Sequence, residues 1–213
     1  MPTPPSAPST AEERANCLSH VVGLLGALVS LPFLIFRAAR AGDASFIVGV
    51  AVFSASVLLL YLASALYHGL PPGRAKRVFQ TLDHSLVFFL IAGTYSPITL
   101  GALEGPWGWS LFGVVWGLAL IGILMKTFGK VNHPVLSTTL YVLMGWLIAV
   151  AAKPLMEKMP PSDFCFYWGR AGLHGGVVFF AMESRWRYAH TIWHLFVIAG
   201  TALHFFAILV TAP

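Results

Sequence analysis

The stretch HTIWHLFVIAGTALHFFAILVT, residues 190–211, contains 22 residues and no Asp, Glu, Lys or Arg. A helix needs about 20 predominantly apolar residues to cross the hydrocarbon core of a bilayer. The stretch therefore predicts a membrane-spanning helix. Its first two turns carry His190 and His194, which are spaced i, i+4 and so lie on one side of a helix.

The rest of the chain has the same apolar character. Of its 213 residues, 57% are hydrophobic and only 10% are charged, whereas soluble domains are about 45–50% apolar and about 25% charged. This composition excludes a soluble enzyme, a disordered protein and a disulfide scaffold. The apolar runs are continuous rather than alternating, which favours helices over a membrane β-barrel.

We expect an all-α integral membrane protein built as a bundle of seven transmembrane helices. Residues 1–13 are predicted to be a disordered tail that ends in a capping box at Thr10-Ala11-Glu12-Glu13. Residues 14–213 then form a single membrane domain. The predicted spans cover about residues 18–36, 44–67, 83–103, 109–125, 134–152, 164–182 and 190–211.

The distribution of the 13 basic residues predicts the orientation of this bundle. Basic loops are retained in the cytoplasm, and a cytoplasmic amino terminus with an outside carboxyl terminus places eight basic residues inside and four outside. Arg170 falls within the sixth span. Because the basic residues are scattered over helix ends, no nucleic-acid partner is expected. The inner eight are Arg14, Arg74, Lys76, Arg77, Lys126, Lys130, Arg185 and Arg187, and the outer four are Arg37, Arg40, Lys153 and Lys158.

Six of the eight histidines fall on the predicted cytoplasmic side. Ser64 and His68 repeat the i, i+4 spacing at the end of the second span, and Asp83 opens the third span at the same depth. Polar and ionisable groups at membrane depth are costly and point to a functional site. The six histidines are His20, His68, His84, His133, His190 and His194.

His68, His190 and His194 are the predicted metal ligands. Three imidazoles that leave a fourth position open are typical of a catalytic zinc site. Asp83 would then carry the proton, and Ser64 would bind either Asp83 or a substrate oxygen. Structural interpretations stay open for Ser64, as an interhelical packing residue, and for Asp83, as the N-cap of the third span. His133, His174 and His204 are expected to be interfacial or hydrogen-bonded residues.

These five residues together resemble the signature of the progestin and adipoQ receptor family, most closely its bacterial branch, hemolysin III. The resemblance extends over nearly the whole chain. The matching strings are Ala15-Asn16 with Ser19-His20, Ser64-Ala65-Leu66-Tyr67-His68, Leu82-Asp83-His84-Ser85, Ile91-Ala92-Gly93-Thr94-Tyr95, and the run from His190 to Phe206.

The resemblance implies a seven-helix protein of the bacterial inner membrane, with Zn²⁺ held by the three histidines and Asp83 reaching the metal through water. It also implies kinship with alkaline ceramidases, for which metal-dependent lipid hydrolysis is proposed. In the sixth span the family carries small residues and a Tyr-Thr pair. Here Gly169-Arg170 and Leu173-His174 occupy that stretch, and they would line a polar cavity.

Three functions follow from the sequence. The first is a zinc-dependent hydrolase that acts on a lipid amide or ester near the cytoplasmic leaflet. The second is a non-enzymatic sensor or regulator of the membrane with structural zinc, and the third is a cytolysin, as the hemolysin label suggests. Membrane lipid is the expected partner in each case, and the sequence identifies no protein partner.

Overall fold

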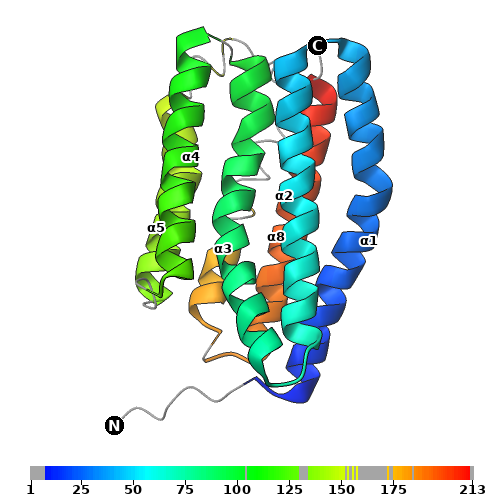
Figure 1. The fold of residues 1–213 in the computed structure, drawn as a ribbon, viewed down its shortest axis with the longest axis vertical. Coiled ribbons are helices and arrows are strands. Elements are labelled where there is room, and N and C mark those ends of the chain that lie inside the picture. Colours follow the sequence, from blue (N-terminus) through cyan, green and yellow to red (C-terminus); the bar gives the residue numbers. More distant parts are fainter. Residues whose placement is uncertain are drawn as a thin grey trace.

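The computed structural model describes residues 8–103, 105–129, 134–151, 172, 175–183 and 185–211, together with Lys153, Leu155 and Glu157. Every regular element in this part of the chain is helical, which confirms the all-α prediction (Figure 1). The named elements are α1 (Thr10–Ala41), α2 (Ala44–Gly69), α3 (Arg74–Pro97), the wider π-helical turn η1 (Ile98–Ala102), α4 (Gly105–Thr127), α5 (Pro134–Trp146), the tighter 3₁₀ turn η2 (Leu147–Ala151) and α8 (Ala189–Thr211).

Five of the described helices are long and apolar enough to cross a membrane. They agree with the first, second, third, fourth and seventh predicted spans. The predicted fifth span corresponds to a shorter apolar helix, Leu136–Ala151, and most of the predicted sixth span lies outside the described residues, including Arg170 and His174. The five long helices are Thr10–Ala41, Ala44–Gly69, Arg74–Ala102, Gly105–Thr127 and Ala189–Val210.

The third helix begins nine residues before its predicted start, at Arg74 rather than at Asp83. The interpretation of Asp83 as an N-cap is therefore wrong, because this residue lies in the middle of α3. Apolar content marks only the part of a helix that faces hydrocarbon. The stretch from Arg74 to Gln80 consists mostly of residues that favour helix and extends α3 beyond that part.

The first helix begins with a capping box one residue earlier than predicted. The Ser9 hydroxyl accepts a hydrogen bond from Glu12 N at 3.3 Å, and Glu12 Oε2 accepts one from Ser9 N at 2.9 Å. Ser9, not Thr10, is thus the N-cap. Glu13, which the sequence assigned to the box, is left free to make other contacts.

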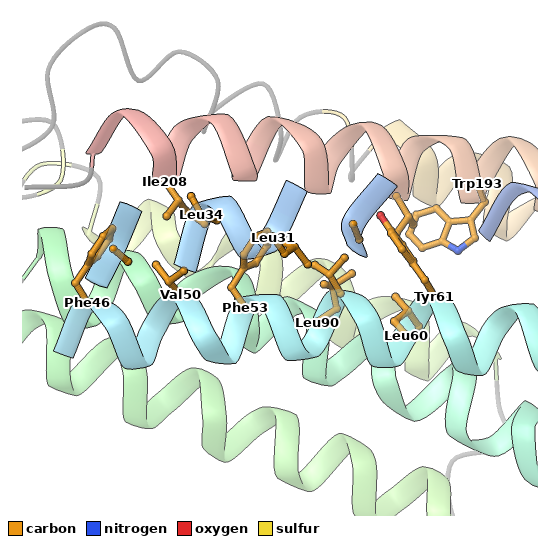
Figure 2. Packing of buried hydrophobic residues seen from close by; sticks show 14 residues of the cluster. Leu31, Leu34, Phe46, Val50, Phe53, Leu60, Tyr61, Leu90, Trp193 and Ile208 are labelled. Carbon is orange, nitrogen blue, oxygen red and sulfur yellow. The ribbon is translucent and has the colours of Figure 1, made fainter. Parts of the chain in front are cut away.

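α2 lies at the centre of the bundle, between α1 and α3, and α8 packs against α1. Figure 2 shows the apolar side chains that fill the space between α2, α1 and α8, among them Leu34, Val50, Phe53 and Ile208. A second apolar cluster joins α3 to α4 and α5 around Phe88. Burial of these side chains holds the helices together.

Four helix ends meet at one end of the bundle, which we call the histidine end. α1, α3 and α8 begin there and α2 ends there, whereas α8 ends at the opposite end of the bundle (Figure 1). Short connections cause this arrangement, since α1 to α2 and α2 to α3 turn within a few residues. The residues near positions 13, 68, 83 and 190 are thereby brought together.

Gly49 allows the close approach of α2 to the end of α3. An added Cβ there would lie 2.7 Å from both Pro97 Cα and the Ser96 carbonyl oxygen, and these backbone atoms cannot move aside by rotation. Overpacking of this kind costs about 1–3 kcal/mol. Gly49→Ala should lower the Tm of the detergent-solubilised protein by about 2–10 °C in a thermal unfolding assay.

Gly26→Ala is the matched control, because no atom lies within 4 Å of a Cβ built on Gly26. Its Tm should equal or exceed that of the wild type, since alanine favours helix more than glycine does. Equal Tm values for the two variants would contradict the packing described for α2 and α3.

Candidate metal centre

His68, His190 and His194 form a cluster at the histidine end, as the sequence predicted. One ring nitrogen from each lies within 4.8 Å of the others. His68 comes from the last turn of α2, and the other two come from the first two turns of α8. His68 and His194 are buried and His190 is partly buried. The three side chains can therefore hold a metal ion between them.

A carboxylate lies behind two of the three imidazole rings. His68 Nδ1 is 2.7 Å from Glu13 Oε2 on α1, and His190 Nδ1 is 2.7 Å from Glu183 Oε2 in the turn that precedes α8. A carboxylate only accepts at these distances, so each Nδ1 donates its N–H. Carboxylates in this position orient metal-binding histidines and make them better ligands.

The third ring is held by α1. His194 Nδ1 lies 2.9 Å from Ser19 Oγ and 3.2 Å from the Asn16 carbonyl oxygen. The Ser19 hydroxyl is also 2.7 Å from the same carbonyl, to which it donates. With that oxygen as acceptor, His194 also carries its proton on Nδ1.

The Nδ1 contacts leave the Nε2 atoms to face the metal position. The Nε2 atoms of His68 and His190 are buried and have no hydrogen-bond partner. A buried nitrogen lone pair without a partner is costly, and a metal ion in the centre of the cluster would satisfy it. The residues therefore fit a metal ion by the chemistry of their donor atoms as well as by their spacing.

Glu13 also connects three helices at this point. Its Oε1 atom accepts from Lys76 Nζ at 3.1 Å, and the same ammonium group donates to the Tyr67 carbonyl oxygen at 3.0 Å. Glu13 on α1 thus contacts His68 on α2 and Lys76 on α3 at once. The position of His68 depends on the beginning of α1.

Asp83 and Ser64 lie beside the cluster without belonging to it. Both side chains are buried, Asp83 with 6% of its surface exposed and Ser64 with none. Asp83 interacts electrostatically with His190, and its carboxyl group lies near the Ser64 hydroxyl, although the pair does not form a hydrogen bond of standard geometry. The structure thus brings all five predicted site residues to one place.

His20 adds a further imidazole to the site, and its side chain is buried. Its ring stacks on the ring of His194, with centroids 3.8 Å apart and planes 9° from parallel. It also stacks on the ring of Tyr61, with centroids 5.0 Å apart. The sequence placed His20 at the correct end of its helix but assigned it no role.

His204, expected to be structural, accordingly binds the Gly200 carbonyl oxygen of its own helix through Nδ1.

Two spaces meet at the cluster. A polar vestibule of about 580 Å³ opens at the histidine end and is lined by His68, His190 and residues of the turn before α8. A narrow cavity of about 70 Å³ extends deeper between apolar side chains, and Asp83 and His194 line it. His190 lines both spaces, so a molecule that reached the metal position would have a polar side and an apolar side.

The residues that hold the rings were not predicted from the sequence; they are Glu13, Glu183 and Ser19. The chain has only eight acidic residues. In so acid-poor a chain, any carboxylate near the histidine end is a candidate partner for an imidazole, and this signal could have identified both glutamates. His133 and His174 lie outside the described residues.

Comparison with known proteins identifies the family of the chain. A model of the family described as "Haemolysin-III related" matches residues 9–205. The chain is 41% identical to "Hemolysin-3" of Bacillus cereus over 93% of its own length and 90% of that protein, and 40% identical to the "Hemolysin-3 homolog" of Bacillus subtilis over 93% of each. It is 26% identical to the human "Monocyte to macrophage differentiation factor" over 94% of its length and 84% of that protein. The chain belongs to the haemolysin-III-related family.

The two carboxylates behind the rings should tune metal affinity. Glu13→Gln and Glu183→Gln keep the shape of the side chain but lose the charge that supports Nδ1–H donation, and such changes weaken binding by about 10–100-fold. Competition with a chromophoric chelator measures the Kd for Zn²⁺. Asp43→Asn is the control, because Asp43 caps the opposite end of α2 and asparagine caps equally well. Wild-type affinity in both glutamine variants would show that the carboxylates do not support the ligands.

Removal of the metal should destabilise the protein, since an ion at the cluster joins α2 to α8. At a metal concentration of 100 times the Kd, the stabilisation is about 2.7 kcal/mol, which corresponds to a Tm difference of about 5–10 °C. Chelation should therefore lower the Tm, and added Zn²⁺ should restore it. His190→Ala should unfold at the lower temperature in either condition. A wild-type Tm that does not respond to chelation would rule out a metal that bridges the two helices.

Proposed function

We propose, from the premise of haemolysin-III-related family membership, that the protein is a zinc-dependent hydrolase that cleaves the amide or ester bond of a membrane lipid. The observation that carries this proposal is the convergence of three imidazole rings, with one nitrogen of each within 4.8 Å of the others, beside a buried carboxylate where a polar vestibule meets an apolar cavity. His68, His190 and His194 are the proposed zinc ligands.

The donor set favours zinc. Three neutral imidazoles without a thiolate are a usual zinc ligand set, and three protein ligands leave the open position that a catalytic site requires. Bound there, zinc would act as a Lewis acid toward a carbonyl oxygen and would activate water. Glu13, Glu183 and the Asn16 carbonyl would keep the three rings in the required tautomer and orientation.

Asp83 is the proposed general base. Its carboxyl group lies beside the cluster and lines the cavity that a scissile bond would occupy. It would take a proton from the attacking water and pass it to the leaving amine or alcohol. Ser64, buried next to Asp83, would hold the carboxyl group in position or bind the substrate oxygen.

The two spaces at the site support an amphiphilic substrate. The vestibule offers polar groups such as Glu12, Gln80 and Arg187 to a headgroup. The deeper cavity offers Val87, Leu90 and other apolar side chains to an acyl chain. With about 70 Å³ of space, the cavity admits the reacting group and must widen to admit a long chain.

The proposal includes a seven-span topology with the amino terminus in the cytoplasm. Five long apolar helices and the shorter Leu136–Ala151 support it. Basic residues of the predicted inner set lie at the histidine end, Arg14 and Lys76 in the first turns of α1 and α3 and Arg185 in the turn before α8, and such residues stay on the cytoplasmic side. The site would then act on the cytoplasmic leaflet of a bacterial plasma membrane.

A membrane sensor with structural zinc is the second candidate. It is favoured by the contacts that tie the histidines to α1, since Glu13 and Ser19 would transmit any movement of that helix to the metal ligands. In this case the metal would determine the stability of the fold and its signalling state, and no product would form.

Cytolysis is a third candidate, which the name of the Bacillus cereus relative supports. Dye release from liposomes by the purified protein would test it.

Asp83→Asn separates the hydrolase from the sensor. Loss of a general base costs about 10²–10⁴-fold in rate, whereas the three zinc ligands are untouched. We expect zinc content and Tm to stay at wild-type values while the release of fatty acid from ceramide and phospholipid substrates, measured by mass spectrometry, falls at least 100-fold. Lipid hydrolysis at the wild-type rate in a folded, zinc-loaded Asp83→Asn protein would refute the hydrolase.

A further inference from the structure

α3 presents two different faces. Asp83, Val87, Leu90 and Thr94 recur at intervals of three or four residues and line the cavity beside the metal centre. A second set with the same helical spacing lies on the other side of α3 and faces away from the site. It comprises Arg74, Arg77, Val78, Thr81, Leu82, Ser85, Leu86 and Phe89.

The second face of α3 forms the floor of a groove of about 720 Å³ between α2 and α4. Leu59 of α2 lines one wall, and Ile123 and Thr127 of α4 line the other. None of its lining residues lines the vestibule or the narrow cavity. The groove is large enough for a ligand of several hundred Å³ and is separate from the metal centre.

The groove has a cationic end and an apolar end. Arg74 and Arg77 lie in the first turn of α3 at the histidine end and are exposed. No carboxylate in the described part of the chain lies within 4.0 Å of either guanidinium, whereas their neighbour Lys76 is paired with Glu13. Two arginines close together without counter-ions favour a phosphate, which guanidinium groups bind in a bidentate manner.

A buried polar group faces the apolar part of the groove. Ser85 has 6% of its surface exposed, and its hydroxyl has no hydrogen-bond partner. A buried hydroxyl without a partner costs free energy. An ester carbonyl of a bound ligand would satisfy it. The surrounding side chains, including Val78 and Leu82 with 51% and 42% of their surfaces exposed, offer apolar contact.

The length of the groove matches one half of a bilayer. From Arg77 to Phe89 the helix rises about 18 Å, and one leaflet of hydrocarbon is about 15 Å deep. A phosphate at the arginines would therefore place an acyl chain along Leu82, Leu86 and Phe89. Basic pockets between transmembrane helices bind anionic headgroups in this way.

We propose that the α2–α3–α4 groove is a binding site for an anionic phospholipid, with the phosphate at Arg74 and Arg77, an acyl ester at Ser85 and an acyl chain along the apolar floor. This site goes beyond the proposed hydrolase, because it lies on the opposite face of α3 from Asp83. The lipid would be a bound ligand and not a substrate. It would brace the helix that carries the proposed base.

Native mass spectrometry of the full-length protein tests this site. The detergent-solubilised protein is incubated with equal amounts of phosphatidylglycerol and phosphatidylcholine, and the retained lipid is identified. The wild type should retain one phosphatidylglycerol in preference to phosphatidylcholine. The preference should fall roughly 30-fold in the Arg74→Gln/Arg77→Gln protein. Inorganic phosphate in excess should not displace the lipid, because it lacks an acyl chain.

Arg37→Gln/Arg40→Gln is the matched control, because it removes the same charge from an exposed pair with the same i, i+3 spacing near the end of α1, and neither residue lines the groove or the vestibule. It should keep the preference. Leu82→Trp fills the groove at an exposed position and should lower retention of the lipid, whereas Leu120→Trp, on an exposed part of α4 outside the groove, should not. Equal losses in the two arginine pairs, or full retention in both Arg74→Gln/Arg77→Gln and Leu82→Trp, would overturn the proposal.

Discussion

Each of the three clustered histidines has two ring nitrogens in a largely buried environment, and each nitrogen needs a partner there. The surrounding structure depends on how these partners are supplied. The Nδ1 atoms bind acceptors supplied by α1 and by the turn before α8. One nitrogen of each ring lies within 4.8 Å of the others, and the Nε2 atoms of His68 and His190 are buried without a hydrogen-bond partner. This arrangement explains why α1 begins as early as Thr10, since Glu13 and Asn16 reach the rings only if the helix extends past the apolar stretch.

α3 separates two environments and gives the bundle its functional asymmetry. One face carries Asp83 toward the histidines and the narrow cavity, and the other carries Arg74 and Arg77 toward the groove. Lys76, between the two arginines, is drawn to the site by Glu13. A basic cluster that looks uniform in the sequence is thus divided by helical geometry: Lys76 contacts the carboxylate that holds His68, and Arg74 and Arg77 remain available for an anion.

The fold class and the positions of the site residues could be predicted because both rest on local signals. Long apolar runs require helices in a membrane, and the i, i+4 spacing of His190 and His194 survives in any helix. The start of α3 and the partners of the rings could not be predicted from such signals. Arg74–Gln80 is not apolar enough to be counted as part of a span, and Glu13 meets His68 across 55 residues of sequence. Asp83 was grouped with the histidines by its depth in the predicted topology, and the family resemblance implies the same grouping.

The central claim is that three imidazoles of this chain hold one zinc ion with an open position. X-ray absorption spectroscopy at the zinc edge of the purified, zinc-loaded protein measures the ligands directly. We expect three imidazole nitrogens at about 2.0–2.1 Å, from His68, His190 and His194, and one oxygen ligand from water. A shell of four protein ligands, a sulfur ligand, or a spectrum that is unchanged in His194→Ala would contradict it.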